Sequence, residues 1–176
     1  MSHNDSTPSY HRVSLDLMHF LFKHTNHYTI PTQENNLMKI GIGHIVDKFY
    51  NMKRVEIKDT IGLFYADRDE CEDLINTWFE VLHAQQFDCL VSLVFDIGID
   101  QFMETRIPKL LDMGLSKLIP CEIMKIDRIN KIKQIRRKKE VNIYIGESYV
   151  RNVIGGITSK WAKYTSAAYN YDNIKK

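Results

Sequence analysis

The feature that most constrains the fold is a segment that is apolar on all sides. Between Gln85 and Ile97 the apolar side chains follow one another so closely that a helix would have no polar face. A helix of this kind is stable only when other elements surround it. Gly98 is placed to end it, because glycine readily adopts the conformations found after helix C-termini. We therefore predict a buried central helix around which the rest of the chain packs.

A second informative stretch runs from Leu37 to Val46. Ile40, Ile42 and Ile45 are separated by glycines, which is typical of a hairpin strand approached closely by another backbone or by a ligand. His44 ends the glycine-containing run and needs a hydrogen-bond partner if it is buried. So short a pattern often occurs by chance, and a tight hairpin with a structural histidine is its more common explanation.

Further helices are expected on both sides of the hairpin. Apolar residues at helical spacing predict one over 11–23 and a long one over 56–77, whose other face carries the acidic stripe Asp67–Asp73. Thr105 and Pro108 favour the start of a short helix that stops at Gly114. Ser148 is placed to cap a closing helix, after which Trp161 and Tyr164 are expected to pack. Residues 1–10 are polar, and we expect them to be mobile.

The small net charge of +2 conceals a local concentration of basic residues. Lys125 to Glu140 contains eight lysines and arginines and two acidic residues, a net charge of +6, so the remainder of the chain sums to −4. Because the charge is local, a nucleic-acid face is only weakly indicated. Isoleucines recur every third residue through this segment, and Val141, Ile143 and Ile145 then alternate. These patterns leave open a helix with a winding apolar stripe or an extra hairpin with Arg136–Lys139 at its tip.

Several classes of protein are disfavoured by composition. The apolar run near Leu17 is too short to span a bilayer, and we expect neither a signal peptide nor a membrane anchor, so that synthesis in the cytoplasm is expected and any export would use another route. The three cysteines are odd in number and lack metal spacing, which favours reduced thiols in a core. Four histidines could be considered for a metal site, but without a cysteine among them we interpret them as solvated or core residues and expect no cofactor: His19, His24, His27 and His44.

Taken together, these segments resemble the phage-type lysozymes, or endolysins, of glycoside hydrolase family 24. The motifs that carry the resemblance are Ile40-Gly-Ile-Gly-His44, the long helix that follows it, and Gln86-Phe-Asp-Cys-Leu-Val-Ser-Leu-Val-Phe-Asp-Ile-Gly98. The resemblance implies an α+β, mainly α, lysozyme-like fold in a single domain over 11–176. It has a small hairpin lobe over about 24–56, a long linking helix and a helical lobe over about 78–170. The resemblance itself covers roughly residues 12–125 and 147–166, so residues 126–146 are interpreted as a basic insertion.

The same resemblance implies that the family's catalytic residues are missing. Counting back from Gly41, the family's threonine falls on Lys39, its aspartate or cysteine on Gln33, and its catalytic glutamate on His24. Cleavage of a glycan needs a carboxylic acid to protonate the leaving oxygen. A slip of one residue would bring in Glu34, and His24 could then act as the acid, but Lys39 beside it would lower the pKa of the imidazole. The resemblance also implies that His44 pairs with Asp67 on the long helix.

We therefore expect a degenerate lysozyme-like protein of phage or bacterial origin that binds and does not hydrolyse. A protein partner is expected first, a peptidoglycan fragment second and a nucleic acid last. The alternatives are a muramidase with a rearranged site and an effector that uses the insertion. We expect Arg136, Arg137, Lys138 and Lys139 to form the binding element. Two alternatives remain: the segment is a solvated loop whose isoleucines cover the helical lobe, or the four cations pair structurally with Asp67–Asp73.

Overall fold

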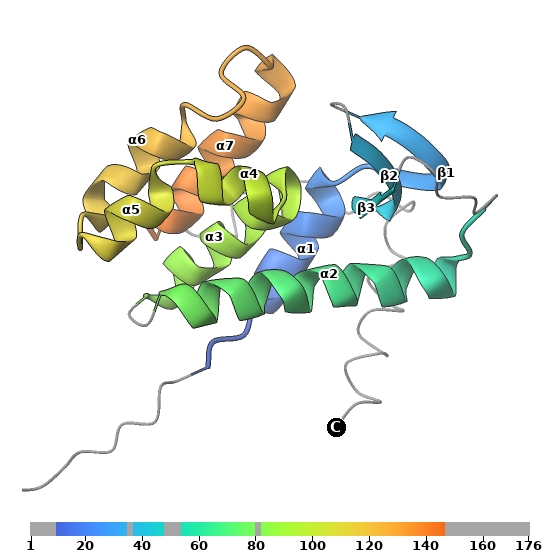
Figure 1. Ribbon diagram of the computed structural model, residues 1–176, viewed down its shortest axis with the longest axis horizontal. Coiled ribbons are helices and arrows are strands. Elements are labelled where there is room, and N and C mark those ends of the chain that lie inside the picture. Colours follow the sequence, from blue (N-terminus) through green and yellow to red (C-terminus); the bar gives the residue numbers. More distant parts are fainter. Residues whose placement is uncertain (1–9, 35–36, 48–53, 80–81, 147–176) are drawn as a thin grey trace, which may run out of the picture.

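The computed structural model describes residues 10–34, 37–47, 54–79 and 82–146. Helices and a small sheet alternate in the order shown in Figure 1: α1 (Leu15–His24), β1 (His27–Glu34), β2 (Leu37–Ile42), β3 (His44–Val46), α2 (Ile57–Trp78), α3 (Ala84–Ile97), α4 (Ile99–Glu104), α5 (Ile107–Asp112), η1 (Ser116–Leu118), α6 (Ile119–Ile123) and α7 (Lys131–Tyr144). The expected lysozyme-like fold, mainly helical with a small antiparallel sheet, is confirmed.

The small lobe is an antiparallel sheet in the order β1-β2-β3. Thr32 faces Lys39 across the first pair, and Ile40 faces His44 across the second. The turn into β3 depends on Gly43, whose φ is +77° and whose missing Cβ would lie 2.8 Å from Cγ2 of Thr25. Glycine tolerates this left-handed backbone without a steric penalty, so the glycine pattern in the sequence sets the point at which the strand reverses.

The long helix α2 runs beneath both lobes, with the sheet over one end and the helical lobe over the other (Figure 1). Its bounds, Ile57–Trp78, agree with the predicted 56–77. Ile61, Phe64 and Ile75 are buried along one side, as the apolar stripe requires. The helix therefore connects the lobes and supplies part of the floor between them.

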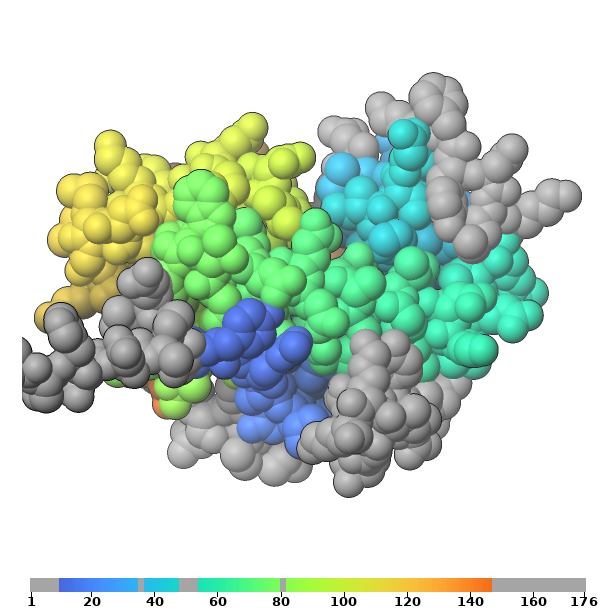
Figure 2. Space-filling view, turned by 60° about the horizontal axis from the view of Figure 1, so that its bottom comes forward, coloured from blue at the N-terminus to red at the C-terminus, as the bar shows by residue number. Residues whose placement is uncertain are grey.

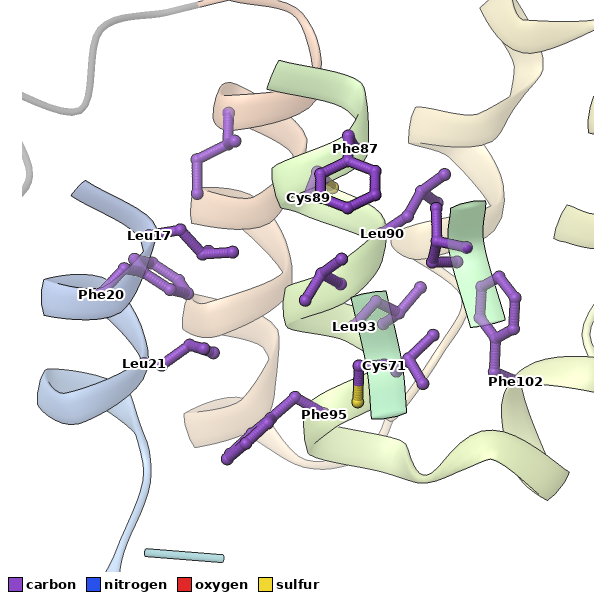
Figure 3. Close-up of a cluster of buried hydrophobic side chains, with 14 of the residues drawn as sticks. Leu17, Phe20, Leu21, Cys71, Phe87, Cys89, Leu90, Leu93, Phe95 and Phe102 are labelled. Carbon is purple, nitrogen blue, oxygen red and sulfur yellow. The ribbon is translucent and has the colours of Figure 1, made fainter. Parts of the chain in front are cut away.

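The central helix is α3, and its burial is as complete as the sequence indicates. Cys89, Leu90, Val91, Leu93 and Val94 are all fully inaccessible to solvent. In Figure 3 the labelled side chains of α1 and α3 converge in a core that α7 also borders. Of the three free cysteines, Cys71 and Cys89 lie in this core and Cys121 is exposed, so a core position was wrongly expected for the third.

The chain before α1 is tied to the core by polar contacts. Ser14 caps α1 by accepting a hydrogen bond from the amide of Leu17 and donates its own hydroxyl to Asp88 on α3 at 2.6 Å. The buried carboxylate of Glu72 on α2 accepts from Arg12 and from the amide of Val13. These contacts fix the start of α1 four residues later than the predicted 11–23.

Residues 131–144 form a helix, so the hairpin alternative for the basic segment is wrong. Asn130 caps α7 by accepting hydrogen bonds from the amides of Ile132 and Lys133. Of the alternating residues Val141, Ile143 and Ile145, Ile143 is buried in the core at the end of this helix together with its neighbour Tyr144, while Ile145 is exposed. Contacts with α3 thus override the strand-like alternation.

Other predictions fall outside the described residues. These are the mobile segment over residues 1–9 and the closing helix that begins at Ser148. Within the described ranges, no helix combines the length and apolarity needed to cross a bilayer.

Candidate functional site

A cleft lies between the small lobe and the helical lobe. In Figure 2 the cyan residues of the sheet and the yellow-green residues of α4 stand on opposite sides of a hollow above α2. Two adjoining pockets of about 580 Å³ and about 350 Å³ occupy it, and both are lined by Leu37, Ile97 and Gln101. The cleft is therefore assembled from β2, the end of α3 and the start of α4.

His44 and Asp67 lie on the wall of the larger pocket. The Nδ1 atom of His44 is 2.8 Å from Oδ1 and 3.0 Å from Oδ2 of Asp67, so one imidazole N–H is shared between two carboxylate oxygens. This hydrogen bond raises the pKa of His44, and burial only partly opposes it. The two residues that the resemblance pairs are thus in contact, and they join β3 to α2.

A lysine lines the smaller pocket. Lys39 is almost fully buried, and its Nζ lies 3.1 Å from Oε2 of Glu34. Asn26 donates to the other carboxylate oxygen of Glu34 at 2.8 Å. Burial would raise the pKa of Glu34, but Lys39 and Asn26 outweigh it and the pKa is lowered. Glu34 is therefore ionised near neutral pH and cannot donate a proton.

Asp96, at the end of α3, is held between cations. Arg136 lies 3.1 Å from Oδ1, Lys133 lies 3.5 Å from Oδ2, and Arg137 also pairs with Oδ2. Burial raises the pKa of Asp96, but the three cations more than offset this and hold it well below its usual range. This carboxylate, which lines the smaller pocket, is thus ionised as well.

His24, at the end of α1, is packed between an aromatic ring and a lysine. Its ring centroid is 4.5 Å from that of Phe20, and its Nε2 atom is 3.2 Å from Nζ of Lys139. Burial, Lys139 and Arg136 lower the pKa of His24 to about 3. The imidazole is therefore neutral throughout the range in which a histidine usually acts as an acid.

The relationship to known proteins follows from both sequence and fold. The family model for phage lysozyme matches residues 23–140, about two thirds of the chain. The chain belongs to the phage lysozyme family. A search of curated proteins returned no match.

Solved structures that resemble this chain confirm the expected lysozyme-like fold. The muramidase domain of SpmX from Asticaccaulis excentricus is 20% identical with a TM-score of 0.63, and the match covers 77% of this chain and 98% of that domain. An endolysin from Escherichia coli O157:H7 phage FAHEc1 is 16% identical with a TM-score of 0.65, and the match covers 81% of this chain and 99% of the endolysin. A variant of P22 lysozyme is 19% identical with a TM-score of 0.58, and the match covers 77% of this chain and 99% of that lysozyme.

The three positions to which the resemblance assigns catalytic residues lie on α1, β1 and β2. His24 ends α1, Gln33 is exposed on β1 opposite Met38, and Lys39 is buried on β2. His24 has the low pKa expected of it, but burial is the largest cause, and the cations that lower the pKa are Lys139, Arg136 and Lys23, not Lys39. Among the described residues, no group of three or more His, Cys, Asp or Glu side chains could hold a metal ion.

The expectation that Arg136 and Arg137 form an exposed binding element is wrong. Their side chains are 6% and 0% exposed, because they point from α7 into a buried network with Glu140 and Asp96. Arg136 also donates to the carbonyl oxygens of His24 and Ser92. The family match continues to residue 140 and so spans most of the segment 126–146 that the resemblance interprets as an insertion.

The sequence contains a signal for this network. Glu140 follows Arg136 by four residues and Arg137 by three, the spacings at which helical side chains meet. No such spacing points to Asp96, which lies 40 residues before Arg136. The alternative pairing with Asp67–Asp73 is not found among the described residues of this chain. The acidic partners of Arg136 and Arg137 are Asp96, Asp127 and Glu140. Of the four predicted residues, only Lys138 is exposed, and Lys139 is half-buried beside His24.

Proposed function

We propose that this member of the phage lysozyme family binds the glycan strand of peptidoglycan in its interlobe cleft without hydrolysing it. The observation that carries the proposal is the protonation state of three groups: His24, which stands where the resemblance has the catalytic glutamate, Glu34, which pairs with the pocket-lining Lys39, and Asp96, which lines the smaller pocket. His24 is neutral, while Glu34 and Asp96 are held as carboxylates by neighbouring cations. Cleavage of a glycosidic bond by the family's mechanism needs a carboxylic acid that is protonated at working pH and placed against the leaving oxygen. His44, whose pKa is raised, is an imidazole and has its Nδ1 bound to Asp67.

Lys39 adds a second obstacle to hydrolysis. Its ammonium group is buried within 3.1 Å of Glu34. A glycosidase builds positive charge on the sugar ring in its transition state. A lysine at this position lies next to the carboxylate that would otherwise stabilise that charge, so the ion pair leaves Glu34 little capacity to act on the sugar.

The cleft nevertheless suits a sugar chain. Its two adjoining pockets provide about 580 Å³ and about 350 Å³ of space, bordered by apolar side chains and by carboxylates and amides. Sugars present hydroxyl groups to such acceptors and donors and apolar ring faces to residues such as Leu37 and Ile97. The alternative of a partner recruited through the basic cluster loses support, because Arg136 and Arg137 are buried.

The proposal is tested with purified peptidoglycan sacculi. We expect the protein to co-sediment with sacculi without releasing soluble fragments at any pH between 5 and 8. Gln101→Trp, which places a bulky ring between the two pockets, is expected to abolish co-sedimentation. Gln85→Trp makes the same change at an exposed position at the start of α3, outside the cleft, and serves as the matched control.

Two outcomes would contradict the proposal. Release of soluble fragments that disappears in His24→Ala would identify a muramidase with a rearranged site. Failure to bind sacculi, or binding that is the same in Gln101→Trp and in the control, would remove the cleft as a glycan site. The triple variant His24→Glu, Gln33→Asp, Lys39→Thr asks separately whether the missing groups alone account for the lost reaction.

A further inference from the structure

The outward face of α7 combines isoleucines with unpaired cations. Ile132 is 82% exposed and Ile135 is 56% exposed. Lys131 and Lys138 are exposed beside them, and these four positions fall on one side of the helix at spacings of three and four residues. We call these four residues the outer α7 face. The turn before the helix extends it with Arg128 and Ile129, the latter 97% exposed.

This face carries only one sign of charge. The described residues contain no carboxylate paired with Arg128, Lys131 or Lys138, whereas Lys133, on the inner side of α7, pairs with Asp96 and Asp127. The two acidic residues nearest in sequence, Asp127 and Glu140, are turned toward Arg137. The acidic partners of α7 are thus used on its inner side, and the outer face is left positive.

The placement of Lys131 is unfavourable for the helix alone. Lys131 is the first residue of α7, and the first turn holds no acidic residue. The amino-terminal end of a helix carries a partial positive charge and favours anions, so an unpaired cation there is repelled. An external anionic surface would remove this repulsion.

We propose that the outer α7 face, with Arg128 and Ile129, docks on an anionic phospholipid bilayer. An amphipathic helix binds at a membrane surface by burying apolar side chains at the headgroup boundary while its lysines and arginines contact the lipid phosphates. Exposed isoleucines flanked by cations meet both requirements. Figure 1 shows the chain that joins α6 to α7 at the upper edge of the molecule, where a flat surface can approach it.

The shape and composition of the face favour a bilayer over an acidic protein. Ile129, Ile132 and Ile135 project from a turn and a convex helix. Flexible cations around projecting apolar groups suit a fluid surface that adapts to them. The inference does not depend on glycan binding, although Arg128 and Ile129 also border the smaller pocket and would bring that rim of the cleft close to the membrane.

The test is co-sedimentation with vesicles of phosphatidylglycerol mixed with phosphatidylcholine, compared with vesicles of phosphatidylcholine alone. We expect binding to the anionic vesicles only, and weakening as salt is added. Each lysine near an anionic surface contributes about fivefold to the partition coefficient, so Lys131→Gln with Lys138→Gln is expected to weaken binding about 25-fold. Ile132→Ser with Ile135→Ser is expected to weaken it at least about tenfold.

The matched control is Arg54→Gln with Lys58→Gln, which removes the same charge from exposed positions before and within the first turn of α2. It is expected to reduce binding by no more than about twofold. A melting curve for each variant confirms that it is folded. In Ile132→Trp, brominated lipid is expected to quench the added fluorescence on anionic vesicles, which shows that this side chain enters the boundary region.

Three results would overturn the proposal. One is equal weakening by the α7 double lysine variant and its control, since binding would then reflect net charge. Another is the absence of quenching in Ile132→Trp on vesicles that the protein binds. The third is binding to soluble polyglutamate but not to anionic vesicles, which would indicate an acidic protein partner.

Discussion

Replacing Glu140 by glutamine should destabilise the protein far more than an ordinary loss of a surface charge. Glu140 is fully buried, and it accepts from Arg136 at 3.0 Å, from Ser92 at 2.8 Å and from Arg137. Glutamine keeps the size and one acceptor oxygen but removes the negative charge. The two buried guanidinium groups would then depend mainly on Asp96, with Arg137 also 3.4 Å from Asp127.

The size of the effect follows from the burial of the partners. Removing one member of a buried ion pair leaves an uncompensated charge and costs about 3–5 kcal/mol. In a protein of this size each kcal/mol lowers the Tm by about 2–4 °C, so we expect a fall of roughly 6–20 °C. Urea denaturation followed by circular dichroism gives the free energy of unfolding directly.

Glu122→Gln is the matched control. Glu122 pairs with Lys125 at 2.7 Å and with Arg106 at 3.5 Å, but both cations are largely exposed to solvent. Exposed pairs contribute about 0–1 kcal/mol. If the two variants lose the same amount of stability, the buried network is not a structural element and the reasoning that assigns Arg136 and Arg137 to the scaffold fails.

Three further predictions concern the hairpin and the long helix. Asp67→Asn should lower the Tm more at pH 6 than at pH 9: Asp67 raises the pKa of His44, so the stabilisation is present below the unfolded-state pKa of about 6.5 and is lost as pH rises through the folded-state value. Equal losses at both pH values would show that the contact adds no charge-dependent stability. Gly62→Ala should stabilise the protein by up to about 1 kcal/mol in urea denaturation, because Gly62 lies inside α2 with nothing within 4 Å of an added Cβ. Gly43→Ala should do the reverse, since its Cβ would meet Thr25 at 2.8 Å, and stabilisation by both changes would contradict this account of the turn.

The elements whose patterns are strong could be predicted from the sequence. The all-apolar segment ending at Gly98 is the central helix α3, and the stripe beginning near Ile57 is α2. In both cases the pattern reflects burial directly, because the hydrophobic effect acts on side chains according to how much water they lose. The glycines before His44 likewise anticipate the reversal at Gly43, since a left-handed backbone position selects glycine.

The residues of the candidate site were predictable only in part. The resemblance, counted back from Gly41, implies that the family's catalytic positions fall on His24, Gln33 and Lys39, but it does not give their environments. That His24 contacts Lys139 across more than one hundred positions of sequence is a consequence of α1 and α7 meeting. The low pKa of His24 and the ion pair of Lys39 with Glu34 therefore depend on tertiary contacts.

The basic segment shows most clearly what the sequence alone determined and what only the tertiary structure decided. The sequence determines that α7 carries many cations, and the spacing of Glu140 allows two of them a local partner. It does not determine which side of the helix is buried, because arginines on an isolated helix all favour water. Asp96 on α3 supplies the missing charge only once α3 and α7 pack together, and this draws Arg136 and Arg137 inward while Ile132 and Ile135 remain exposed. A charged side chain can be buried where an opposite charge meets it, and here part of that charge comes from a residue distant in sequence. The tertiary structure therefore buries two arginines of α7 and leaves two isoleucines exposed, the opposite of what hydropathy alone predicts.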